Sequence, residues 1–315
     1  MRADGSLPTV DDNERLWATW RREADRSHAN MTIFLGSSRM QCSISEAAWK
    51  SYFPSDRTIQ LGIVGASSLP LLEDIANNSS FRGVVLCELD SWHLVPGRPT
   101  QRSREFISLY RDKWFSPALD FEVWLRAQLQ SRLSLLRQNA GVGKAIVSMA
   151  KGHGLRFAPF YTRTYFDRQT DIDFSRVNTA EQAQRRNKEF NRNWEALAGF
   201  TAEERQSKVD TLRSSIAKIE ARGGHVILIR LPTGGKILET ERQIAPRATH
   251  WDVITRNLPA LHYEDIPGMR DINCPDDSHI DVRDKIRFTS LLAEALIEHG
   301  FLSKFPASNS EPKRK

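Results

Sequence analysis

Short apolar runs that end at a glycine, a proline or an aspartate recur along the chain. They cover residues 32–35, 59–64, 84–89 and 225–231, and a weaker one covers residues 261–263. Runs of this length with such endings are typical of buried strands. Because apolar side chains occupy nearly every position, we expect both faces of each strand to be buried, as in parallel sheets. The pattern therefore predicts a parallel sheet of five strands.

Segments with helical spacing lie between these runs. In residues 201–222, Thr201 and Glu204 form the pattern of a capping box, and Gly223 marks the end of the helix. Apolar residues recur there at helical intervals, at Val209, Leu212, Ile216 and Ile219. Further helices are expected at residues 13–29, 43–52, 69–77 and 282–299, the last capped by Asp281. Strands that alternate with helices predict an α/β fold, here a flavodoxin-like three-layer αβα sandwich.

A long stretch, residues 97–200, interrupts this alternation and predicts a large helical insertion. One apolar stripe runs through Trp124, Leu125, Leu129, Leu133 and Leu136. Ligands bind at the carboxyl edge of the sheet in this fold type, so we interpret the insertion as a lid or a substrate wall over that edge. The expected organisation is a lead-in and helix in residues 1–30, one domain in residues 31–300 that contains the insertion, and a basic tail in residues 301–315.

The composition limits the classes of protein to which this chain can belong. Apolar residues make up 40% of the 315 residues and charged residues 27%, which is typical of a soluble globular domain. The net charge of +6 comes from basic residues scattered among acids, so we do not expect nucleic-acid binding. Three cysteines without a C-x-x-C pair favour neither a disulfide framework nor a zinc site. The polar first 30 residues and the shortness of the apolar runs predict neither a signal peptide nor a membrane span.

The first candidate for chemistry is Gly36-Ser37-Ser38-Arg39, directly after the first predicted strand. A hydroxyl there would stand at the ligand edge of the sheet, beside the free N–H groups at the start of the next helix. Such groups can hold a developing oxyanion. The alternative is that Ser37 and Ser38 only cap the helix.

The second candidate is the pair Asp276 and His279, just before the last predicted helix. A serine hydroxyl is a weak nucleophile without a base, and histidine is the usual base, oriented by a carboxylate. A spacing of three residues in a turn lets the carboxylate reach Nδ1 of the imidazole. The alternative is an ordinary turn aspartate followed by an exposed histidine.

Together the two segments resemble the block order of the SGNH (GDSL-like) hydrolase superfamily. The resemblance covers residues 31–92 and 224–300 and leaves out the insertion. It implies that Ser38 is the nucleophile and that Asp276 and His279 complete a catalytic triad. Ser37 stands where that family usually has Asp.

The resemblance also implies an oxyanion hole and shows a departure from the family pattern. The N–H groups of Ser38 and Gly65 match the first two donors of that family. The third donor is usually an asparagine after the third strand, but here the strand runs into Asp90, Ser91, Trp92 and His93. Losing one donor typically costs about 10²–10³ in rate. Ser91, His93 and Arg39 are candidates to replace it.

The Gly-Ser-Ser-Arg form of the first block is similar to a subgroup of bacterial cell-envelope proteins that handle acyl groups on polymers, such as the alginate O-acetylation proteins and the D-alanyl lipoteichoic acid transfer protein. The resemblance implies a periplasmic or cell-envelope location and a partner in a membrane-associated pathway. The sequence itself shows no anchor, so the cytoplasm stays the alternative.

Further side chains at the same edge are expected to line a substrate pocket: Ser37, Arg39, Ser91, Trp92, His93 and Arg230. Arg230, near the end of the fourth predicted strand, fits an anionic substrate or, alternatively, an ion pair with Glu239 or Asp265. No group of residues predicts a metal site or a cofactor.

Three functional hypotheses follow. The first is a serine esterase or O-acyltransferase that acts on acyl esters, such as acetyl esters of a polysaccharide. The second is a non-catalytic protein of the same fold that binds a glycan or a partner protein in an envelope-polymer pathway, which the missing asparagine favours. The third, a basic protein that binds nucleic acid, is disfavoured by the scattered charge.

Overall fold

The computed structural model describes residues 7–26, 30–112, 116–136 and 161–303. The N-terminal residues of the expected lead-in and most of the expected basic tail lie outside these ranges, as do residues 137–160 of the expected insertion. Within the described residues, no helix is both long enough and apolar enough to cross a bilayer.

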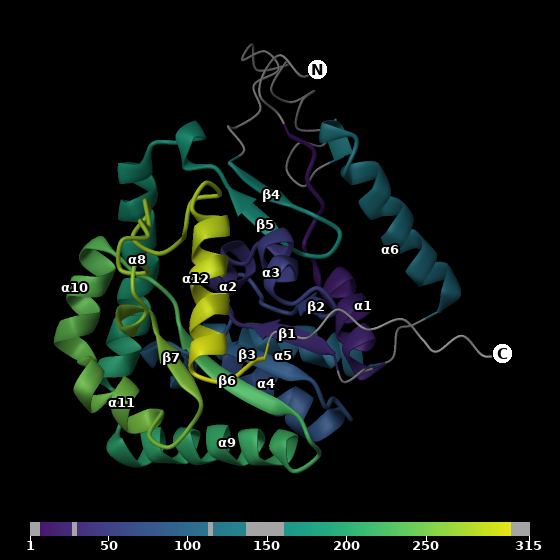
Figure 1. Ribbon diagram of the computed structural model, residues 1–315. Coiled ribbons are helices and arrows are strands. Elements are labelled where there is room, and N and C mark those ends of the chain that lie inside the picture. The colour runs from purple at the N-terminus through teal and green to yellow at the C-terminus, as the bar shows by residue number, and fades with distance from the viewer. Residues whose placement is uncertain (1–6, 27–29, 113–115, 137–160, 304–315) are drawn as a thin grey trace.

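Five parallel strands form the central sheet, in the order β2-β1-β3-β6-β7 (Figure 1). Their bounds are β1 Met31–Leu35, β2 Arg57–Gln60, β3 Val84–Glu88, β6 His225–Arg230 and β7 Ala260–His262. Each strand pairs with its neighbours in parallel register, for example Ile33 with both Ile59 and Val85. The five predicted strands and their parallel arrangement are confirmed.

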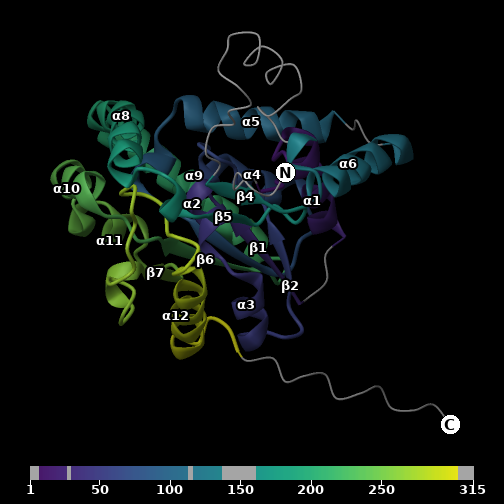
Figure 2. The ribbon, with the colours of Figure 1, turned by 90° about the horizontal axis from the view of Figure 1, so that it is seen from above.

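Helices cover both faces of the sheet, as Figure 2 shows from above. On the first face lie α1 (Glu14–Asp25), α4 (Ser68–Asn78), α5 (Arg98–Arg111) and α9 (Ala202–Glu220), and on the second lie α2 (Ser38–Ser43), α3 (Glu46–Tyr52) and α12 (Lys285–Glu298). Successive strand residues point to opposite cores: Ile33 and Leu35 pack on the first face, and Phe34 packs on the second. The predicted three-layer α/β sandwich is confirmed.

The helix α9, on the first face, agrees closely with the helix predicted from the sequence. Thr201 caps α9, its hydroxyl accepts a hydrogen bond from the Glu204 N–H, and the Glu204 carboxylate accepts one from the Thr201 N–H. The four apolar residues named for this helix are all buried. This agreement reflects the strong local signal of a capping box that precedes an amphipathic repeat.

Most element boundaries differ from the sequence prediction by one to a few residues, and three differences change the structure near the site. The strand expected to continue to residue 64 ends at Gln60. Beyond it the Leu61 and Ile63 N–H groups still bond to β1 and its turn, and the buried Arg168 side chain donates to the carbonyl oxygens of Gln60 (2.7 Å) and Gly62 (2.8 Å). The helix expected at residues 43–52 is divided into α2 and α3, and Ser45 caps the second.

The start of the last helix is the third difference. Asp281 does not cap it: its carboxylate instead accepts hydrogen bonds from the Phe174 N–H (3.0 Å) and from Arg283. The helix α12 begins at Lys285, with Asp284 in the cap position.

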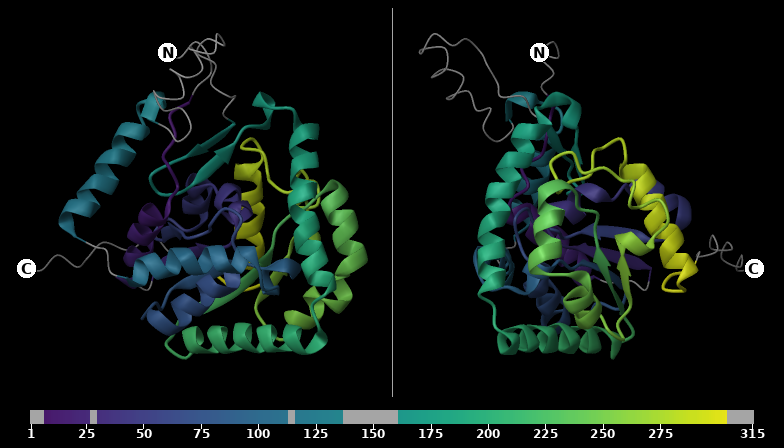
Figure 3. Two further views of the ribbon diagram at one scale, coloured as in Figure 1. Left: turned by 180° about the vertical axis from the view of Figure 1, so that it is seen from behind. Right: turned by 90° about the vertical axis from the view of Figure 1, so that its left-hand side faces the viewer.

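The region between β3 and α9 contains α5, α6 (Pro117–Gln130), the hairpin of β4 (Thr162–Thr164) and β5 (Thr170–Ile172), and α8 (Thr179–Ala198). The α6 helix extends away from the body of the molecule, as Figure 3 shows from behind. Its apolar stripe is half exposed, with Trp124 at 47% and Leu129 at 42% of their full accessible surface. The stripe therefore does not join the main cores.

Candidate active site

The turn after β1 is shaped by a close approach to β3. A Cβ on Gly36 would lie 2.4 Å from a carboxylate oxygen of Glu88, so only glycine fits there. The Ser37 N–H (2.6 Å) and hydroxyl (3.0 Å) both donate to that buried carboxylate. The Ser37 hydroxyl also accepts from the Arg39 N–H and caps α2. Ser37 is thus a structural residue of the turn, which leaves the Ser38 hydroxyl free for other contacts.

The Ser38 hydroxyl meets the loop that precedes α12. Its Oγ lies 2.8 Å from Nε2 of His279. Nδ1 of His279 lies 2.9 Å from Oδ2 of Asp276, whose other oxygen accepts from the N–H groups of Ser278 (3.1 Å) and His279 (2.7 Å). A carboxylate can only accept, so Nδ1 carries the hydrogen and Nε2 is left to accept from the Ser38 hydroxyl. The structure therefore joins the three residues in the order Ser-His-Asp.

The Asp276 carboxylate is buried, yet it is held in its charged form. Burial by itself raises the pKa of Asp276, but His279, its hydrogen bonds and the Arg186 guanidinium outweigh burial and hold the pKa well below its usual range. Nε of Arg186, on α8, donates to Oδ2 of Asp276 at 3.1 Å. The loop is further fixed at Asp277, which has a positive φ of 66° and bonds to Asn187 and to the Lys236 N–H.

Arg39 ties the serine turn to the histidine loop. Its buried guanidinium donates to the carbonyl oxygens of Leu231 (2.8 Å), Pro232 (2.7 Å) and Ser278 (3.2 Å). It also forms an ion pair with Asp90, which follows β3. With every donor group engaged inside the protein, Arg39 holds the site together and has no donor left for an oxyanion.

Asp90 also forms an ion pair with a second arginine, which lies at the end of the neighbouring strand β6. Nη1 of Arg230 lies 2.9 Å from Oδ1 of Asp90, and its Nη2 pairs with Glu241. Burial alone would raise the pKa of Asp90, but Arg230 and Arg39 lower it below the usual range. The ion pair considered for Arg230 in the sequence is present, but the partners are Asp90 and Glu241 rather than Glu239 or Asp265.

Of the described residues, Glu88, Asp90 and His93 are the one group of potential metal ligands that lie close together, within 4.8 Å. Arg39 and Arg230 already neutralise Asp90, and Ser37 occupies the Glu88 oxygens. Both carboxylates are therefore taken up by arginine and serine, and although Nε2 of His93 is buried without a hydrogen-bond partner among the described residues, one free imidazole nitrogen does not make a metal site.

Ser38 and His279 line a cavity of about 520 Å³ at the carboxyl edge of the sheet, and Asp276 is buried behind them. Ser38, Gly65 and His279 line it from the sheet side. The segment from Trp92 to Arg102 forms one wall, and α8 forms another. Two helices of the region between β3 and α9 thus shape the space in front of the serine.

Among the other candidates for substrate binding, Ser37, Arg39 and Trp92 line this cavity, but three residues do not. Ser91 and Arg230 line a separate small cavity beside Glu241. His93 is buried behind the site, where Nδ1 contacts the Ser68 hydroxyl (3.1 Å) and the Asp90 N–H (3.3 Å). The sequence correctly predicted that these side chains lie at the carboxyl edge of the sheet, but it could not predict which way they point.

The two residues predicted to form the oxyanion hole, Ser38 and Gly65, both line the cavity. Ser38 is the first residue of α2, so its N–H has no partner within the helix. Gly65 lies in a turn closed by the Ala66 N–H to Ile63 carbonyl bond (3.1 Å), and its φ of +69° favours glycine. Ser91, His93 and Arg39 do not supply the third donor, because their side chains lie outside the cavity or are fully bonded.

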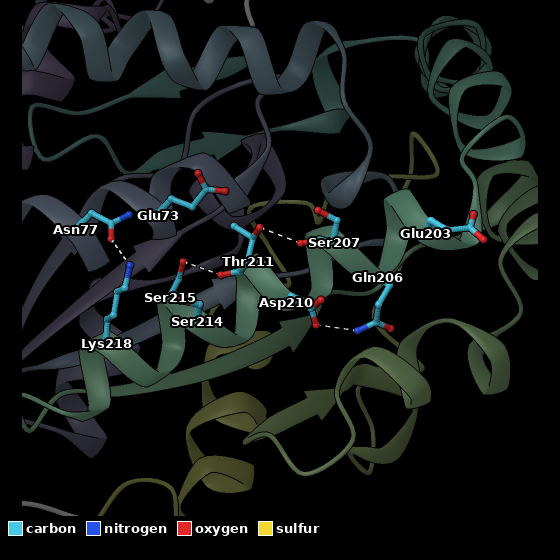
Figure 4. A pocket seen from close by; sticks show the side chains of 10 residues that line it. All are labelled: Glu73, Asn77, Glu203, Gln206, Ser207, Asp210, Thr211, Ser214, Ser215 and Lys218. Atoms are coloured by element: carbon cyan, nitrogen blue, oxygen red, sulfur yellow. Dashed lines mark hydrogen bonds between the residues drawn. The ribbon is translucent and has the colours of Figure 1, made fainter.

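A second groove, of about 720 Å³, lies elsewhere, between α4 and α9 (Figure 4). Its polar side chains bond within the groove, for example Lys218 to Asn77 (2.8 Å) and Gln206 to Asp210 (2.8 Å). No histidine lies beside a serine in this groove, so it offers no acid–base chemistry comparable to that at Ser38.

No protein-family model matches the chain, and no curated protein shows significant similarity to it. The fold and the site together define an α/β protein with a Ser-His-Asp arrangement at the carboxyl edge of a parallel sheet. The residues that sequence reasoning missed are Glu88 and Arg186, which contact the site from other elements. Neither has a local motif that could have identified it.

Proposed function

We propose that this chain is a serine esterase or O-acyltransferase of the SGNH (GDSL-like) kind that acts on acyl esters. The observation that carries the proposal is the continuous set of contacts from Ser38 through His279 to Asp276 at one end of an open cavity. A serine hydroxyl bonded to a histidine, which is itself oriented by a buried carboxylate, is the arrangement that activates a nucleophile.

The reaction takes place in two steps. In the first, Ser38 Oγ attacks the carbonyl carbon while its proton moves to His279 Nε2, and the N–H groups of Ser38 and Gly65 receive the oxyanion. The C–O bond of the ester then breaks, and the leaving alcohol takes the proton from His279. In the second step His279 removes a proton from water or from an acceptor hydroxyl, whose oxygen attacks the acyl-serine. The bond between the acyl carbon and Ser38 Oγ then breaks, and His279 returns the proton to Ser38 Oγ.

The oxyanion hole sets an expectation for the rate. With two backbone donors and no third side chain, we expect turnover about 10²–10³ slower than in a site with the full set. Such a slow reaction suits transfer to an acyl acceptor that stays bound beside Ser38 until the reaction takes place. The choice between water and a sugar hydroxyl as acceptor, a polysaccharide as substrate and the cell envelope as location all belong to this proposal.

The second candidate is a non-catalytic protein of the same fold that binds a glycan or a partner in an envelope-polymer pathway. One observation favours it: the position after β3 is taken by Asp90, which is locked between two arginines and cannot act as a donor. The cavity would then bind its ligand without acylation of Ser38.

Labelling with a fluorophosphonate probe separates the two candidates. We expect the wild-type protein to be labelled, and Ser38→Ala and His279→Ala to lose labelling, because the probe reacts only with an activated serine. Ser207→Ala, in the groove on α9, is the matched control and should label like wild type. A folded wild-type protein that binds acylated glycan but is never labelled would contradict the esterase proposal and favour the binding protein.

A further inference from the structure

We infer that two copies of this chain form a symmetric dimer, in which the outer face of α6 packs antiparallel against the same face of the second copy. The contact surface consists of apolar side chains of α6 and of the turn that follows it. The inference does not rest on the proposed reaction at Ser38, because none of these side chains lines the cavity.

Exposed apolar side chains are concentrated in this part of the chain. Among the described residues, nine large apolar side chains are exposed, and six of them lie within residues 121–136. These six, between 39% and 58% exposed, are Phe121, Trp124, Leu125, Leu129, Leu133 and Leu136. Single exposed apolar side chains are common on protein surfaces, but a contiguous patch of them marks an interaction site.

The inner face of α6 already has its partners within the chain. Val123 and Ala127 pack with Val10 and Leu16 in a small cluster of their own. Leu125 lies two residues from both Val123 and Ala127, which is about 200° around the helix, so it points away from this cluster. Because α6 also extends away from the body of the molecule (Figure 3), its outer face can accept a partner without any change in the fold.

The spacing of the apolar residues on the outer face fits a second copy of the same face. Four of them follow one another at intervals of four residues: Phe121, Leu125, Leu129 and Leu133. Leu133 continues the helical turn, because its N–H donates to the Leu129 carbonyl (2.8 Å). Ridges with this spacing interlock in the commonest class of helix packing.

One register satisfies all four residues at once. In an antiparallel pair centred between Leu125 and Leu129, each Leu125 faces Leu129 of the second copy. Each Phe121 then faces Leu133 of the second copy. A two-fold axis relates the two chains, so every contact is made twice, as in the common type of homodimer.

The charges beside this ridge favour the antiparallel direction. The same register places Glu122 opposite Arg132 of the second copy. Glu122 contacts Arg15 at 3.6 Å in an exposed pair, and the Arg132 guanidinium bonds to the carbonyl and side chain of Gln128, so both charges lie at the surface. A parallel pair would instead place Glu122 against Glu122 and Arg132 against Arg132, which is unfavourable.

The patch is large enough for a weak dimer. An aromatic side chain can bury about 150–250 Å², so Phe121, Trp124 and the leucines offer several hundred Å² in each copy. The total for two copies comes to about 1,000 Å², the lower end of specific interfaces. The Phe121 and Trp124 rings stack with their centroids 5.7 Å apart, and aromatic residues of this kind contribute most of the affinity at interfaces. We therefore expect a dissociation constant of about 1–100 µM.

Sedimentation equilibrium of the full chain at about 1–300 µM tests the inference. We expect the wild type to change from monomer to dimer over this range, and Leu125→Gln with Leu129→Gln to stay monomeric, because two amides would lie in the middle of the ridge. The control is Val253→Gln with Ile286→Gln, which removes two exposed apolar side chains outside α6 and should dimerise like wild type. A wild-type chain that stays monomeric, or a dimer that the α6 variant leaves intact, overturns the inference.

A charge exchange tests the antiparallel register. Glu122→Arg and Arg132→Glu each place like charges opposite one another, so each alone should weaken dimerisation about three- to tenfold. The double variant restores opposite charges and should return to within about twofold of wild type. A double variant as weak as both single effects combined would overturn the antiparallel pairing.

Two other occupants of the α6 face would give different results. A monomeric wild type that binds vesicles of phosphatidylcholine and phosphatidylglycerol, with binding lost in the α6 variant, would show that a membrane covers the face and would overturn the dimer. A monomeric wild type whose α6 variant unfolds more easily would show that other residues of the same chain cover the face, which also overturns it.

Discussion

The bottom of the cavity is formed by Ser38 and His279 with Asp276 behind them, and its rim is formed by arginines of α5 and α8. The two regions differ in how many of their hydrogen-bonding groups already have a partner. At the bottom, His279 and Asp276 are only 2% and 1% exposed, and their polar contacts are 3.1 Å or shorter. At the rim, Arg98 and Arg192 are exposed, with no acid in reach among the described residues. The bottom is already complete without a ligand, whereas the rim still has hydrogen-bond donors to offer.

This difference separates two tasks. Preorganised groups stabilise a transition state because they need no rearrangement during the reaction. Exposed donors on helices outside the sheet framework are available to a ligand, and they can change without disturbing the triad. We therefore expect changes at the bottom to lower the rate, and changes at the rim to alter affinity.

The largest expected effect is at Asp276. Replacing it with Asn keeps the shape but removes the charge that orients the imidazole and stabilises its protonated form, so kcat for an acyl ester should fall by about 10⁴-fold. The measurement is ester hydrolysis with a chromogenic acetyl ester, with the unfolding transition followed in parallel.

The matched control is Asp277→Asn, one residue away. Its carboxylate bonds to Asn187 and to the Lys236 N–H, not to the triad, and Asn tolerates its positive φ. Its kcat should stay within a few-fold of wild type. A loss as large as that of Asp276→Asn would mean that loop geometry, rather than the charge on Asp276, sets the rate.

The second effect concerns Arg39. Arg39→Met removes the charge that faces Asp90 and the donors to Leu231, Pro232 and Ser278, so the buried Asp90 keeps only one of its two arginine partners. Breaking a buried ion pair of this kind costs about 3–5 kcal/mol. Denaturant unfolding should show that loss.

The control for this variant is Arg132→Met, an exposed side chain just after α6 that, within the described chain, bonds only to Gln128 in the last turn of that helix. It should change the free energy of unfolding by less than about 0.5 kcal/mol. Near-equal losses for the two variants would contradict the role of Arg39 as the link between the serine turn and the histidine loop.

Most of the site residues that the sequence could predict lie at the bottom of the cavity. Ser38 follows a strongly apolar strand, and Asp276 and His279 pair over three residues, so both segments have local signals. A parallel sheet then brings the strand end and the last loop to one edge. The meeting of Ser38 and His279, 241 residues apart, follows from the topology alone.

The remaining contacts had no such signal. Arg186 is one of several arginines on α8, and its partner Asp276 is 90 residues away. A position at a strand end also leaves the side chain's direction open. Arg230 turns toward Asp90 and Glu241 because both acids are buried beside it, and burial with opposite charges outweighs exposure at the edge.

The third expected effect is a pH dependence of stability. The pKa of Asp276 is lowered in the folded protein, below its ordinary unfolded value near 3.9. The unfolded state therefore takes up this proton first, and the stabilisation from Asp276 is present above about pH 4 and is lost as pH falls further. The gap in unfolding free energy between wild type and Asp276→Asn should shrink from pH 6 to pH 3.

This comparison isolates one group, because Glu241, whose pKa burial raises, contributes equally in both proteins. A gap that stays constant down to pH 3 would show that the charged form of Asp276 is not preferentially stabilised in the fold.

A smaller effect is expected at Glu189, the one acid that lines the cavity. Its carboxylate contacts Arg185 (3.5 Å) and Arg186 (2.8 Å). Glu189→Gln frees charge at the rim, so binding of an oligosaccharide that carries carboxylates should tighten by about two- to fivefold, the range of an exposed ion pair. Calorimetry in the Ser38→Ala background measures it. A neutral oligomer that gains equally would show a change of shape rather than of charge.

The smallest effect is expected on α6, where apolar side chains are exposed. Leu125 (39%) and Leu129 (42%) lie one turn apart on its open face. In the dilute monomer, replacing both with Gln should change the free energy of unfolding by less than about 0.5 kcal/mol, because little apolar surface is lost from a core. Leu212→Ala on α9, where the leucine is 1% exposed, should cost about 2–5 kcal/mol and provides the contrast. A loss above about 1 kcal/mol for the double variant in the dilute monomer would show that other residues of the same chain, rather than a second copy, cover the α6 face.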